Sequence, residues 1–408
     1  MYILREYQNR AVIASVNQFK FYKYPFMVVA PTGSGKSLII ANIAKQLGNV
    51  LILQPSKEIL ESNYAKMLAY HCADNVKIYS ASMNSKEIGD FTYATIGSIY
   101  RKPELFKDFQ YIIIDECHLV NPKNLSGMYN SFFKALGNPK IMGLTATPYR
   151  LVAKYHKEGE DLFSTMYLQM LNRIYPFFFK KIVYEKPIGQ LFKEGFLCPI
   201  EYMDGDNDFD TSNIPLNTTG ADFNAAALER YLLLNARLLK VYSAVCEIKD
   251  RVKHLLIFAS SLKQAEKIKE ILTPLFPIGF VCSDTPAKER DQIIDDFRQG
   301  KLKAVVNVGI LTTGFDFPEL DGIILARPTL SLSLYYQMIG RGIRIHPEKE
   351  RCLVIDCAGN VERFGRVETI EIATEDGFKN IIRTERGVVT GKPLFTWQVK
   401  KKEGLLNG

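Results

Sequence analysis

The chain has 408 residues, of which 47% are hydrophobic and 24% are charged. These proportions exclude a largely disordered chain, and the length favours two domains of ordinary size. The net charge of +8 comes mostly from residues 1–150, which carry 17 basic and 10 acidic residues. This balance suits a polyanionic partner without identifying it.

Two further properties of the sequence narrow the class of protein. No apolar run approaches the length of a bilayer span, and the N-terminus lacks the layout of a signal peptide. We therefore expect a cytoplasmic protein without a membrane partner. The seven cysteines are scattered and form no C-x-x-C pair, so we expect buried reduced thiols rather than a zinc site or disulfides.

The first strong motif is a phosphate-binding loop. Residues 30–37 read Ala-Pro-Thr-Gly-Ser-Gly-Lys-Ser, between an apolar run at 26–29 and a helical pattern at 38–44. A strand, a Gly-containing loop and a helix N-terminus present backbone N–H groups to an anion, and here Lys36 adds a charge while Ser37 can hold Mg²⁺. The motif predicts a nucleoside triphosphate site that includes Thr32, Gly33, Ser34, Gly35, Lys36 and Ser37.

Apolar runs alternate with amphipathic helical patterns in two separate parts of the chain. We expect strands at 26–30, 50–54, 76–80, 93–95, 111–115 and 141–145, and again at 254–259, 278–282, 304–307, 322–326 and 352–356. This alternation predicts two α/β domains in tandem, each with a parallel sheet and flanking helices.

The segment between the two series differs from both. It contains an aromatic run at 175–179, for which we expect core packing, and a helical pattern at 228–245. Beyond about residue 370 we expect a solvated chain end. We assign the first domain to 1–150, a helical or irregular insertion to 151–195, the second domain to 196–360 and a short extension to 361–408.

Two carboxylates follow the predicted strand at 111–115, where ligands gather in parallel sheets. Asp115 can hold Mg²⁺, and Glu116 can orient or deprotonate the attacking water. An Asp-Glu pair at a strand end can also be a solvated helix N-cap. Thirty residues later, 143–148 reads Gly-Leu-Thr-Ala-Thr-Pro, which alone fits a cap or a turn.

These motifs, in this order, resemble superfamily 2 helicases and translocases. The resemblance implies two RecA-like domains, with ATP and Mg²⁺ bound in the cleft between them. Residues 4–8 resemble the family's adenine-reading segment, which implies that Arg5 and Gln8 contact the nucleotide. Residues 115–118 are similar to the DEAH-type box, with Cys117 in place of Ala. The resemblance further implies that nucleotide state is coupled to strand binding by His118, Thr145 and Thr147, and that nucleic acid contacts Pro55, Ser56, Gly97 and Ser98.

The second half continues the resemblance. Residues 258–261, 307–318 and 337–344 are similar to motifs IV, V and VI of the family. Arg341 and Arg344 would act on the γ-phosphate, and their spacing would place them on one side of a helical turn. The family pattern also implies a catalytic role for Gln337, nucleotide contacts for Gly314 and Asp316, and nucleic-acid contacts for Ser260 and Thr312.

Within this superfamily the chain resembles bacterial RadD-type DNA repair proteins, on the stretches 311–315, 327–329, 333–335, 340–344 and 356–360. The resemblance implies an ATP-dependent DNA helicase or translocase in repair, recombination or replication. It implies single-stranded or branched DNA as substrate, and recombination or single-strand-binding proteins as partners. One departure is clear, because residues 361–408 contain no cysteine and so lack the zinc-binding extension of RadD-type proteins. A bacterial cell or a phage-infected host is the expected setting, in association with the nucleoid.

Three alternatives stay open at this stage. An RNA helicase of the same superfamily would be stimulated by RNA rather than by DNA. A translocase of a restriction or remodelling complex would hydrolyse ATP on duplex DNA without separating the strands. An ATP-gated clamp would bind nucleic acid and scarcely hydrolyse ATP, against which Glu116 and the paired arginines argue.

Overall fold

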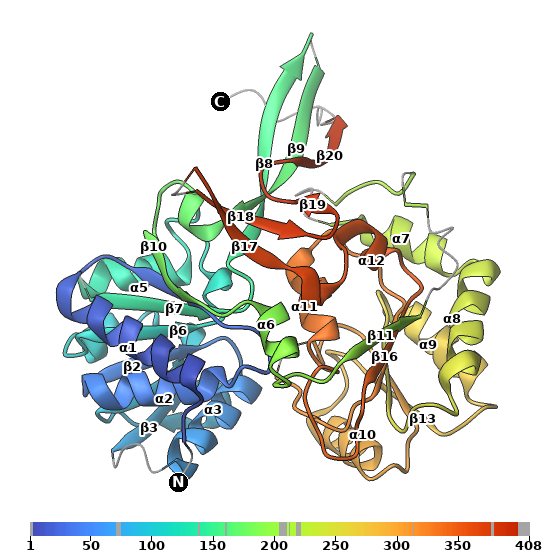
Figure 1. Cartoon of the computed structure of the whole chain (residues 1–408), viewed down its shortest axis with the longest axis horizontal. Helices are drawn as coiled ribbons and strands as arrows, with labels where there is room; N and C mark the ends of the chain where they lie inside the picture. Colours follow the sequence, from blue (N-terminus) through green and yellow to red (C-terminus); the bar gives the residue numbers. More distant parts are fainter. Residues whose placement is uncertain are drawn as a thin grey trace. The chain divides into compact units, whose positions relative to one another are not determined.

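The computed structural model describes residues 3–70, 75–137, 139–159, 161–203, 210–211, 213–217, 222–312, 314–376 and 379–398. The chain divides into two compact units, and neither is continuous in sequence (Figure 1). The first unit comprises residues 1–149, 170–197 and 313–316, and the second comprises 150–169, 198–312 and 317–408. Within the described ranges, no helix combines the length and the apolar character needed to cross a bilayer.

The first unit is built on an eight-stranded sheet in the order β10-β1-β7-β6-β2-β5-β3-β4. All neighbours are parallel except β3 and β4, which are antiparallel. The central strands are buried along their whole length, as expected for a parallel sheet covered on both faces. The strands are β1 (Phe26–Val29), β2 (Val50–Gln54), β3 (Val76–Ser80), β4 (Ser85–Lys86), β5 (Phe91–Thr95), β6 (Tyr111–Asp115), β7 (Lys140–Thr145) and β10 (Lys181–Glu185).

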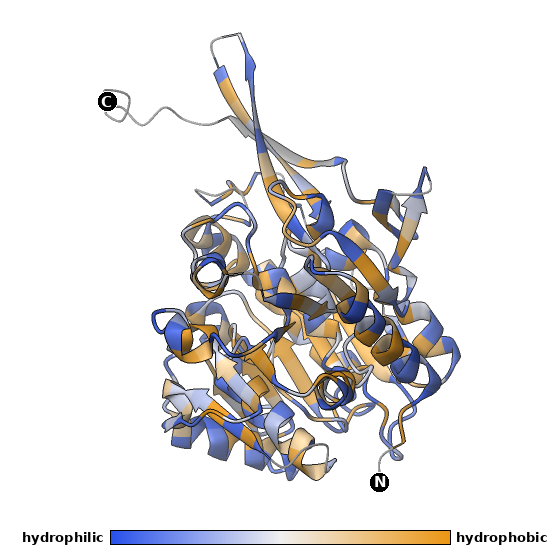
Figure 2. Cartoon of the chain, turned by 90° about the vertical axis from the view of Figure 1, so that its left-hand side faces the viewer, coloured by the Kyte–Doolittle hydropathy of each residue, from blue (hydrophilic) through white to orange (hydrophobic). Residues whose placement is uncertain are grey.

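Helices cover this sheet and contribute one apolar face each to its core. In α3, for example, the three buried residues are Leu60, Asn63 and Met67, which recur at helical spacing. Figure 2 shows strands that are mostly hydrophobic beside helices that also carry hydrophilic residues. The helices of the first unit are α1 (Glu6–Phe21), α2 (Lys36–Leu47), α3 (Lys57–Ala69), α4 (Ile96–Ile99), α5 (Met128–Leu136) and α6 (Ile188–Lys193).

The second unit contains a six-stranded, fully parallel sheet in the order β11-β16-β15-β12-β14-β13. Its strands are β11 (Ile200–Met203), β12 (Leu255–Phe258), β13 (Ile278–Val281), β14 (Ala304–Asn307), β15 (Gly322–Leu325) and β16 (Cys352–Asp356). Its helices are α7 (Ala225–Leu232), α8 (Asn235–Ile248), α9 (Leu262–Leu272), α10 (Ala287–Arg298), α11 (Leu332–Ile339) and α12 (Asn360–Phe364). The prediction of two parallel α/β sheets in tandem is confirmed.

The structure differs from the sequence-based expectation in three segments. The single helical pattern at 228–245 is two helices, because Leu233 ends α7 and the extended backbone at Leu234 precedes α8. The segment after β7 contains two long strands, β8 (Tyr149–Glu158) and β9 (Asp161–Met170), rather than a helical or irregular insertion. The expected solvated end is also wrong for 371–398, where four further strands form.

These additional strands make two small sheets. One has the order β20-β9-β8, with β20 (Pro393–Gln398) antiparallel to β9. The other has the order β17-β18-β19, formed by β17 (Glu371–Glu375), β18 (Lys379–Thr384) and β19 (Gly387–Val388). The aromatic run at 175–179 is only partly core, because Phe179 is fully buried whereas Tyr175 is 75% exposed. For the acidic stretch 204–210 we expect a solvated turn rather than a calcium site, and for the basic run 400–402 a solvated end; residues 204–209 and 400–402 lie outside the described residues.

The topology of the first sheet decides where its functional side chains gather. Because β1, β7, β6, β2, β5 and β3 are parallel neighbours, their carboxyl ends share one edge. The phosphate loop follows β1, Asp115 ends β6 and Thr145 ends β7, while Gln54 and Thr95 end β2 and β5. The predicted ATP residues and the predicted nucleic-acid residues of this unit therefore follow neighbouring strands at one edge.

Candidate ATP site and nucleic-acid surface

The phosphate loop has the backbone conformation that its glycines permit. Gly33 and Gly35 have φ values of +81° and +78°, which belong to the left-handed region that side chains disfavour. A Cβ at Gly33 would lie 2.7 Å from Leu197 Cδ2, and one at Gly35 would lie 2.5 Å from Gln8 Nε2. Helix α2 begins at Lys36, directly after this loop. The loop and the helix N-terminus together form the cradle expected for phosphates.

Lys36 and Glu116 form an ion pair at the centre of the site. Lys36 Nζ lies 3.2 Å from Glu116 Oε1, and both side chains are largely buried. Glu116 has a φ of +49°, a left-handed conformation that costs a non-glycine residue about 1–3 kcal/mol. This backbone turn lets the Glu116 N–H donate to Asp115 Oδ1 at 3.0 Å. Glu116 thus directs its own carboxylate to Lys36, and its N–H holds the carboxylate of Asp115.

The two neighbouring carboxyl groups have opposite pKa shifts. Burial, together with the negative charge of Glu116, raises the pKa of Asp115 to about 6. Burial would also raise the pKa of Glu116, but Lys36 and His118 outweigh it and hold this pKa well below its usual range. Pairs of carboxyl groups with opposite shifts are typical of sites that use each group differently.

The three residues predicted to couple nucleotide state to strand binding lie together beside Glu116. His118 Nδ1 is 3.0 Å from Thr145 Oγ1 and 3.3 Å from Thr147 Oγ1. The same nitrogen lies 3.3 Å from Glu116 Oε2. A proton on Nδ1 would be donated to this carboxylate oxygen. The His118 ring thus links Thr145 and Thr147, at the end of β7, to the Glu116 carboxylate that follows β6.

Cys117, which stands where the family pattern has Ala, is fully buried against β7. A Cβ at Gly143 would lie 2.6 Å from both the Cβ and the Sγ of Cys117, and 2.8 Å from a ring carbon of Phe179. The larger side chain in the box is therefore accommodated by the absence of a side chain at Gly143. Burial raises the pKa of the Cys117 thiol, which keeps it neutral.

The two residues predicted to hold Mg²⁺ are connected by a side chain that the sequence analysis did not single out. Asn63 on α3 accepts a hydrogen bond from Ser37 Oγ at 2.5 Å and donates one to Asp115 Oδ2 at 3.0 Å. A hydroxyl and a carboxylate oxygen are ligands that suit Mg²⁺. Among the described residues, no group of three His, Cys, Asp or Glu side chains could hold a metal alone. The remaining ligands would be phosphate oxygens and water, as is usual for Mg²⁺ in nucleotide sites.

Of the two predicted nucleotide contacts near the N-terminus, Gln8 contacts the phosphate loop and Arg5 contacts Gln8. Gln8 Nε2 donates to the Ser34 carbonyl oxygen at 2.9 Å, and Gln8 Oε1 accepts from the Arg5 N–H at 2.9 Å. Tyr7 Oη also donates to the Ser34 carbonyl, at 2.7 Å. The Arg5 guanidinium lies 4.1 Å from the ring centroid of Phe196, a contact that the sequence did not reveal.

The predicted nucleic-acid residues of the first unit follow β2 and β5. Ser56 caps α3, where its Oγ accepts from the Ile59 N–H at 3.4 Å, and Pro55 precedes it. Ser98 Oγ accepts from the Ala81 N–H at 2.9 Å, while Gly97 has open space around its Cα. These residues therefore surround the β2 and β5 ends, next to the strand that carries Asp115.

Gly314 and Asp316 also belong to the first unit, where they contact α3. A Cβ at Gly314 would lie 3.1 Å from Glu58 Cβ, and Gly314 has a φ of +75°. Asp316 Oδ2 lies 3.7 Å from Lys66 Nζ. These contacts place the motif V segment beside α3.

In the second unit, the remaining predicted residues follow three strands of the sheet. Ser260 follows β12, and Thr312 follows β14, where its Oγ1 donates to the Gly309 carbonyl at 3.1 Å. Gln337 lies in α11, and its carbonyl accepts from Arg341 Nε at 3.3 Å. Helix α11 ends at Ile339, so Arg341 and Arg344 lie in the following turn and loop rather than on the helical turn that we expected. Burial lowers the pKa of Arg344 to about 10, which leaves it charged at neutral pH.

Family models match both units of this structure. Residues 1–150 match the model described as "Type III restriction enzyme, res subunit", and residues 237–346 match "Helicase conserved C-terminal domain". The two matches occur in the order in which the sequence resembles the two domains of superfamily 2 helicases.

Known proteins resemble this chain at low sequence identity. The protein IRC3 of Saccharomyces cerevisiae is 28% identical over 377 residues, which are 88% of this chain and 52% of IRC3. The DNA 3′–5′ translocase XPB2 of Sulfurisphaera tokodaii is 24% identical over 86% of this chain and 80% of XPB2. The solved structure of the ATP-dependent Type ISP restriction-modification enzyme LlaBIII bound to DNA is similar in fold, with a TM-score of 0.61. The similarity covers 88% of this chain and 28% of the LlaBIII chain, at 18% sequence identity. The chain thus corresponds to about half of IRC3 and to a smaller part of LlaBIII.

The second unit contains a partly buried side chain, Lys349, whose role the sequence did not reveal. Lys349 Nζ donates to the carbonyl oxygens of Pro318, Leu320 and Gly342 at 2.6, 2.9 and 2.9 Å. Burial lowers the pKa of Lys349, whose ammonium is surrounded by backbone oxygens. Gly342 lies between Arg341 and Arg344, so Lys349 holds the arginine segment against the loop that precedes β15.

The other end of α11 is held by the segment that follows β16. Asn360 accepts from the Thr329 N–H at 3.0 Å and donates to the Arg327 carbonyl at 3.0 Å. Asp356 Oδ1 accepts from Asn360 Nδ2 at 3.2 Å and from the Ala358 N–H at 3.0 Å. The Asp-Cys-Ala-Gly-Asn stretch that resembles RadD-type proteins is therefore a structural brace for the loop before α11.

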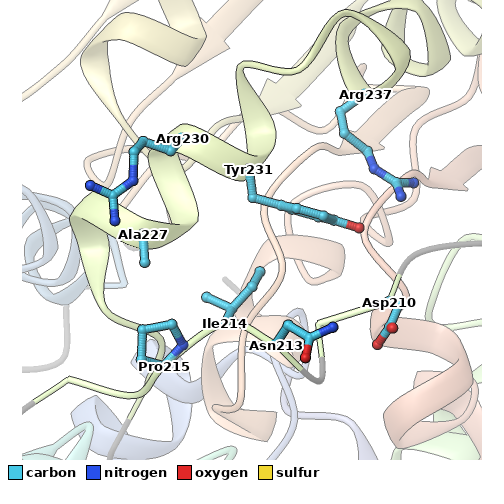
Figure 3. A pocket seen from close by; sticks show the side chains of 8 residues that line it. All are labelled: Asp210, Asn213, Ile214, Pro215, Ala227, Arg230, Tyr231 and Arg237. Carbon is cyan, nitrogen blue, oxygen red and sulfur yellow. The ribbon is translucent and has the colours of Figure 1, made fainter.

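A cavity of about 430 Å³ lies elsewhere in the second unit (Figure 3). Its lining combines charged, polar and apolar side chains, namely Asp210, Asn213, Ile214, Pro215, Ala227, Arg230, Tyr231 and Arg237. The Arg237 guanidinium lies 4.9 Å from the Tyr231 ring centroid. None of the residues predicted to contact ATP or nucleic acid lines this cavity, so we do not assign the nucleotide to it.

Proposed function

We propose that this chain is an ATP-dependent DNA translocase or helicase, which couples ATP hydrolysis to movement on DNA or to its remodelling. The observation that carries the proposal is the cluster of Lys36, Glu116, His118, Thr145 and Thr147 at one edge of the first sheet. This edge also carries the ends of β2 and β5, where nucleic-acid contacts are expected. A nucleotide site and a strand-binding surface on one edge allow each to respond to the other.

The ion pair suggests how hydrolysis is controlled. When phosphates occupy the loop, Lys36 turns from Glu116 toward them, and the pKa of Glu116 rises toward the range of a useful base. The Glu116 carboxylate then accepts a proton from the attacking water. Ser37 and Asp115 would hold Mg²⁺, which supplies charge neutralisation on the phosphates when it is bound. Arg341 and Arg344 would stabilise the charge that develops on the γ-phosphate, because guanidinium groups fit phosphoryl oxygens.

DNA is the proposed polymer, in single-stranded or branched form. The name of the relative XPB2 describes a DNA translocase, and the first 150 residues carry an excess of seven positive charges, with 17 basic and 10 acidic residues. The finer assignment to DNA repair rests on the stretches that resemble RadD-type proteins. Their zinc-binding extension has no counterpart in the cysteine-free residues 361–408, so partner docking through such an extension is not part of the proposal.

An ATPase assay with four nucleic acids tests the proposal. The purified protein is given ATP and Mg²⁺ with single-stranded DNA, duplex DNA, forked DNA or RNA at equal nucleotide concentration. We expect the greatest stimulation with single-stranded or forked DNA. Stimulation by RNA alone would identify an RNA helicase, and stimulation by duplex without strand separation would identify a duplex translocase. Absence of ATPase activity with all four would overturn the proposal.

Replacing Lys349 should slow turnover without weakening ATP binding. Lys349→Met removes the charge that holds Gly342, so the arginine segment loses its fixed position, and a displacement of about 1 Å can cost on the order of 100-fold in rate. Three carbonyl oxygens also lose their donor, which should lower the free energy of unfolding by about 1–3 kcal/mol. The measurements are steady-state ATPase kinetics, nucleotide binding and thermal melting. Lys301→Met, at an exposed lysine of the same unit paired with Asp296, serves as the control. A turnover number equal to that of the control would contradict this role.

A further inference from the structure

Asn63 is the one polar residue among the three buried residues of helix α3. Leu60 and Met67, at i−3 and i+4, are fully buried on the same face, and Asn63 is 6% exposed. Burying an amide costs free energy unless its polar atoms find partners. An asparagine at this position therefore needs a reason that packing does not provide.

The partners of Asn63 supply that reason. Its Oδ1 accepts from Ser37 Oγ, and its Nδ2 donates to Asp115 Oδ2 and, at 3.1 Å, to Gln54 Oε1. Ser37 lies in the first turn of α2, and Asp115 ends β6, so one side chain connects two elements that have no sequence proximity. The Ser37 hydroxyl and the Asp115 carboxylate are the proposed Mg²⁺ ligands of this chain.

We propose that Asn63 is a positioning residue that orients Ser37 and Asp115 toward the magnesium ion of bound ATP. Because the Ser37 proton is directed to Asn63 Oδ1, the lone pairs of the hydroxyl are left for a cation. Because Nδ2 binds one oxygen of Asp115 and the Glu116 N–H binds the other, the carboxylate has a fixed orientation. Partners of this kind commonly change metal affinity by about 10- to 100-fold when they are removed.

Helix α3 is itself well placed to hold this side chain still. Its first turn is capped by Ser56, and its exposed side contacts Asp316 through Lys66. The same helix thus begins at a predicted nucleic-acid contact and reaches the predicted metal ligands through Asn63. The inference rests on the proposed ATPase function and deepens it at this one site.

The test compares nucleotide binding with and without magnesium, which separates positioning from general damage. Binding of a fluorescent ADP analogue is measured in excess Mg²⁺ and in EDTA for the wild type, Asn63→Leu and Asn42→Leu. Asn42 is the matched control, because its Nδ2 donates only to the Leu38 carbonyl within α2. We expect Asn63→Leu to bind the analogue in EDTA as the wild type does, and to lose about 10-fold of the tightening produced by Mg²⁺.

The possible results distinguish the role of Asn63 from the proposed ATPase function on which that role rests. If the wild type binds no nucleotide in Mg²⁺, the proposed function fails. If the wild type tightens in Mg²⁺ and Asn63→Leu tightens equally, only the role of Asn63 is overturned. An equal loss of affinity in EDTA and in Mg²⁺ would also overturn it, because it would indicate a structural defect. Should Asn63→Leu not fold, Asn63→Ser carries the same expectation, since its short side chain cannot bridge the two ligands.

Discussion

Glu116→Gln is expected to abolish ATP turnover while ATP and DNA binding stay close to wild type. The amide has the shape of the carboxylate but cannot accept a proton from water, and loss of a general base costs about 100- to 10,000-fold in rate. The side chain keeps its place beside Lys36 and His118, because the left-handed backbone of residue 116 and its N–H bond to Asp115 do not depend on the carboxylate. Single-turnover ATPase assays and equilibrium binding of ATP and single-stranded DNA measure the two effects separately.

The control for this variant is a glutamate that forms an ion pair away from the site. Glu87 pairs with Lys77 at 2.7 Å on the exposed surface of the first unit, so Glu87→Gln should leave turnover unchanged. A Glu116→Gln enzyme whose turnover remains within a few-fold of this control would exclude Glu116 as the base. The ATPase site would then have to be assigned to other groups.

Lys36→Ala is expected to weaken nucleotide binding itself. A charge-assisted hydrogen bond contributes about 1.5–3 kcal/mol, which corresponds to roughly a 10- to 150-fold loss of ATP affinity. The variant also leaves Glu116 without its cation, so the carboxylate would repel the phosphates that Lys36 otherwise attracts. Both effects act in the same direction, and titration calorimetry with ATP in Mg²⁺ measures their sum.

A lysine from the same helix provides the comparison. Lys45 lies in the last turn of α2, far along the helix from the phosphate loop, so Lys45→Ala should bind ATP normally. If Lys36→Ala bound ATP as tightly as Lys45→Ala, the loop at 30–37 would not be the phosphate site. The two expectations together distinguish the residue that binds ATP from the residue that hydrolyses it.

The strands of both sheets other than β4, β10 and β11 could be predicted from the sequence because of how parallel sheets are covered. A strand buried on both faces is apolar along its whole length, so it stands out from the surrounding helical patterns. The pair β8 and β9 lacked this signal, since residues 154–158 of β8 are exposed and mostly polar. Strand β10 lies at the sheet edge and is only partly buried, which explains why it was missed.

The residues of the candidate site also differ in how clearly the sequence predicts them. Lys36, Glu116 and His118 were predicted because each lies in a compact motif whose chemistry is carried by side chains. Asn63 lay outside any motif, and its signal was a single polar residue on the apolar stripe of a helix. Lys349 carried less signal still, because its partners are backbone carbonyls, which every sequence contains. The expected helical spacing of the arginines was wrong because α11 ends before both of them.

The discontinuous units have a practical consequence for anyone who wishes to study one of them alone. The chain passes between the units after residues 149, 169, 197, 312 and 316. A gene truncated after residue 149 would encode most of the first unit but would lack β10, and β1 would become an exposed edge strand. Such edges promote aggregation, so a fragment of this kind is a poor substitute for the whole protein. A soluble first unit would instead need residues 170–197 rejoined to residue 149 by a short designed loop.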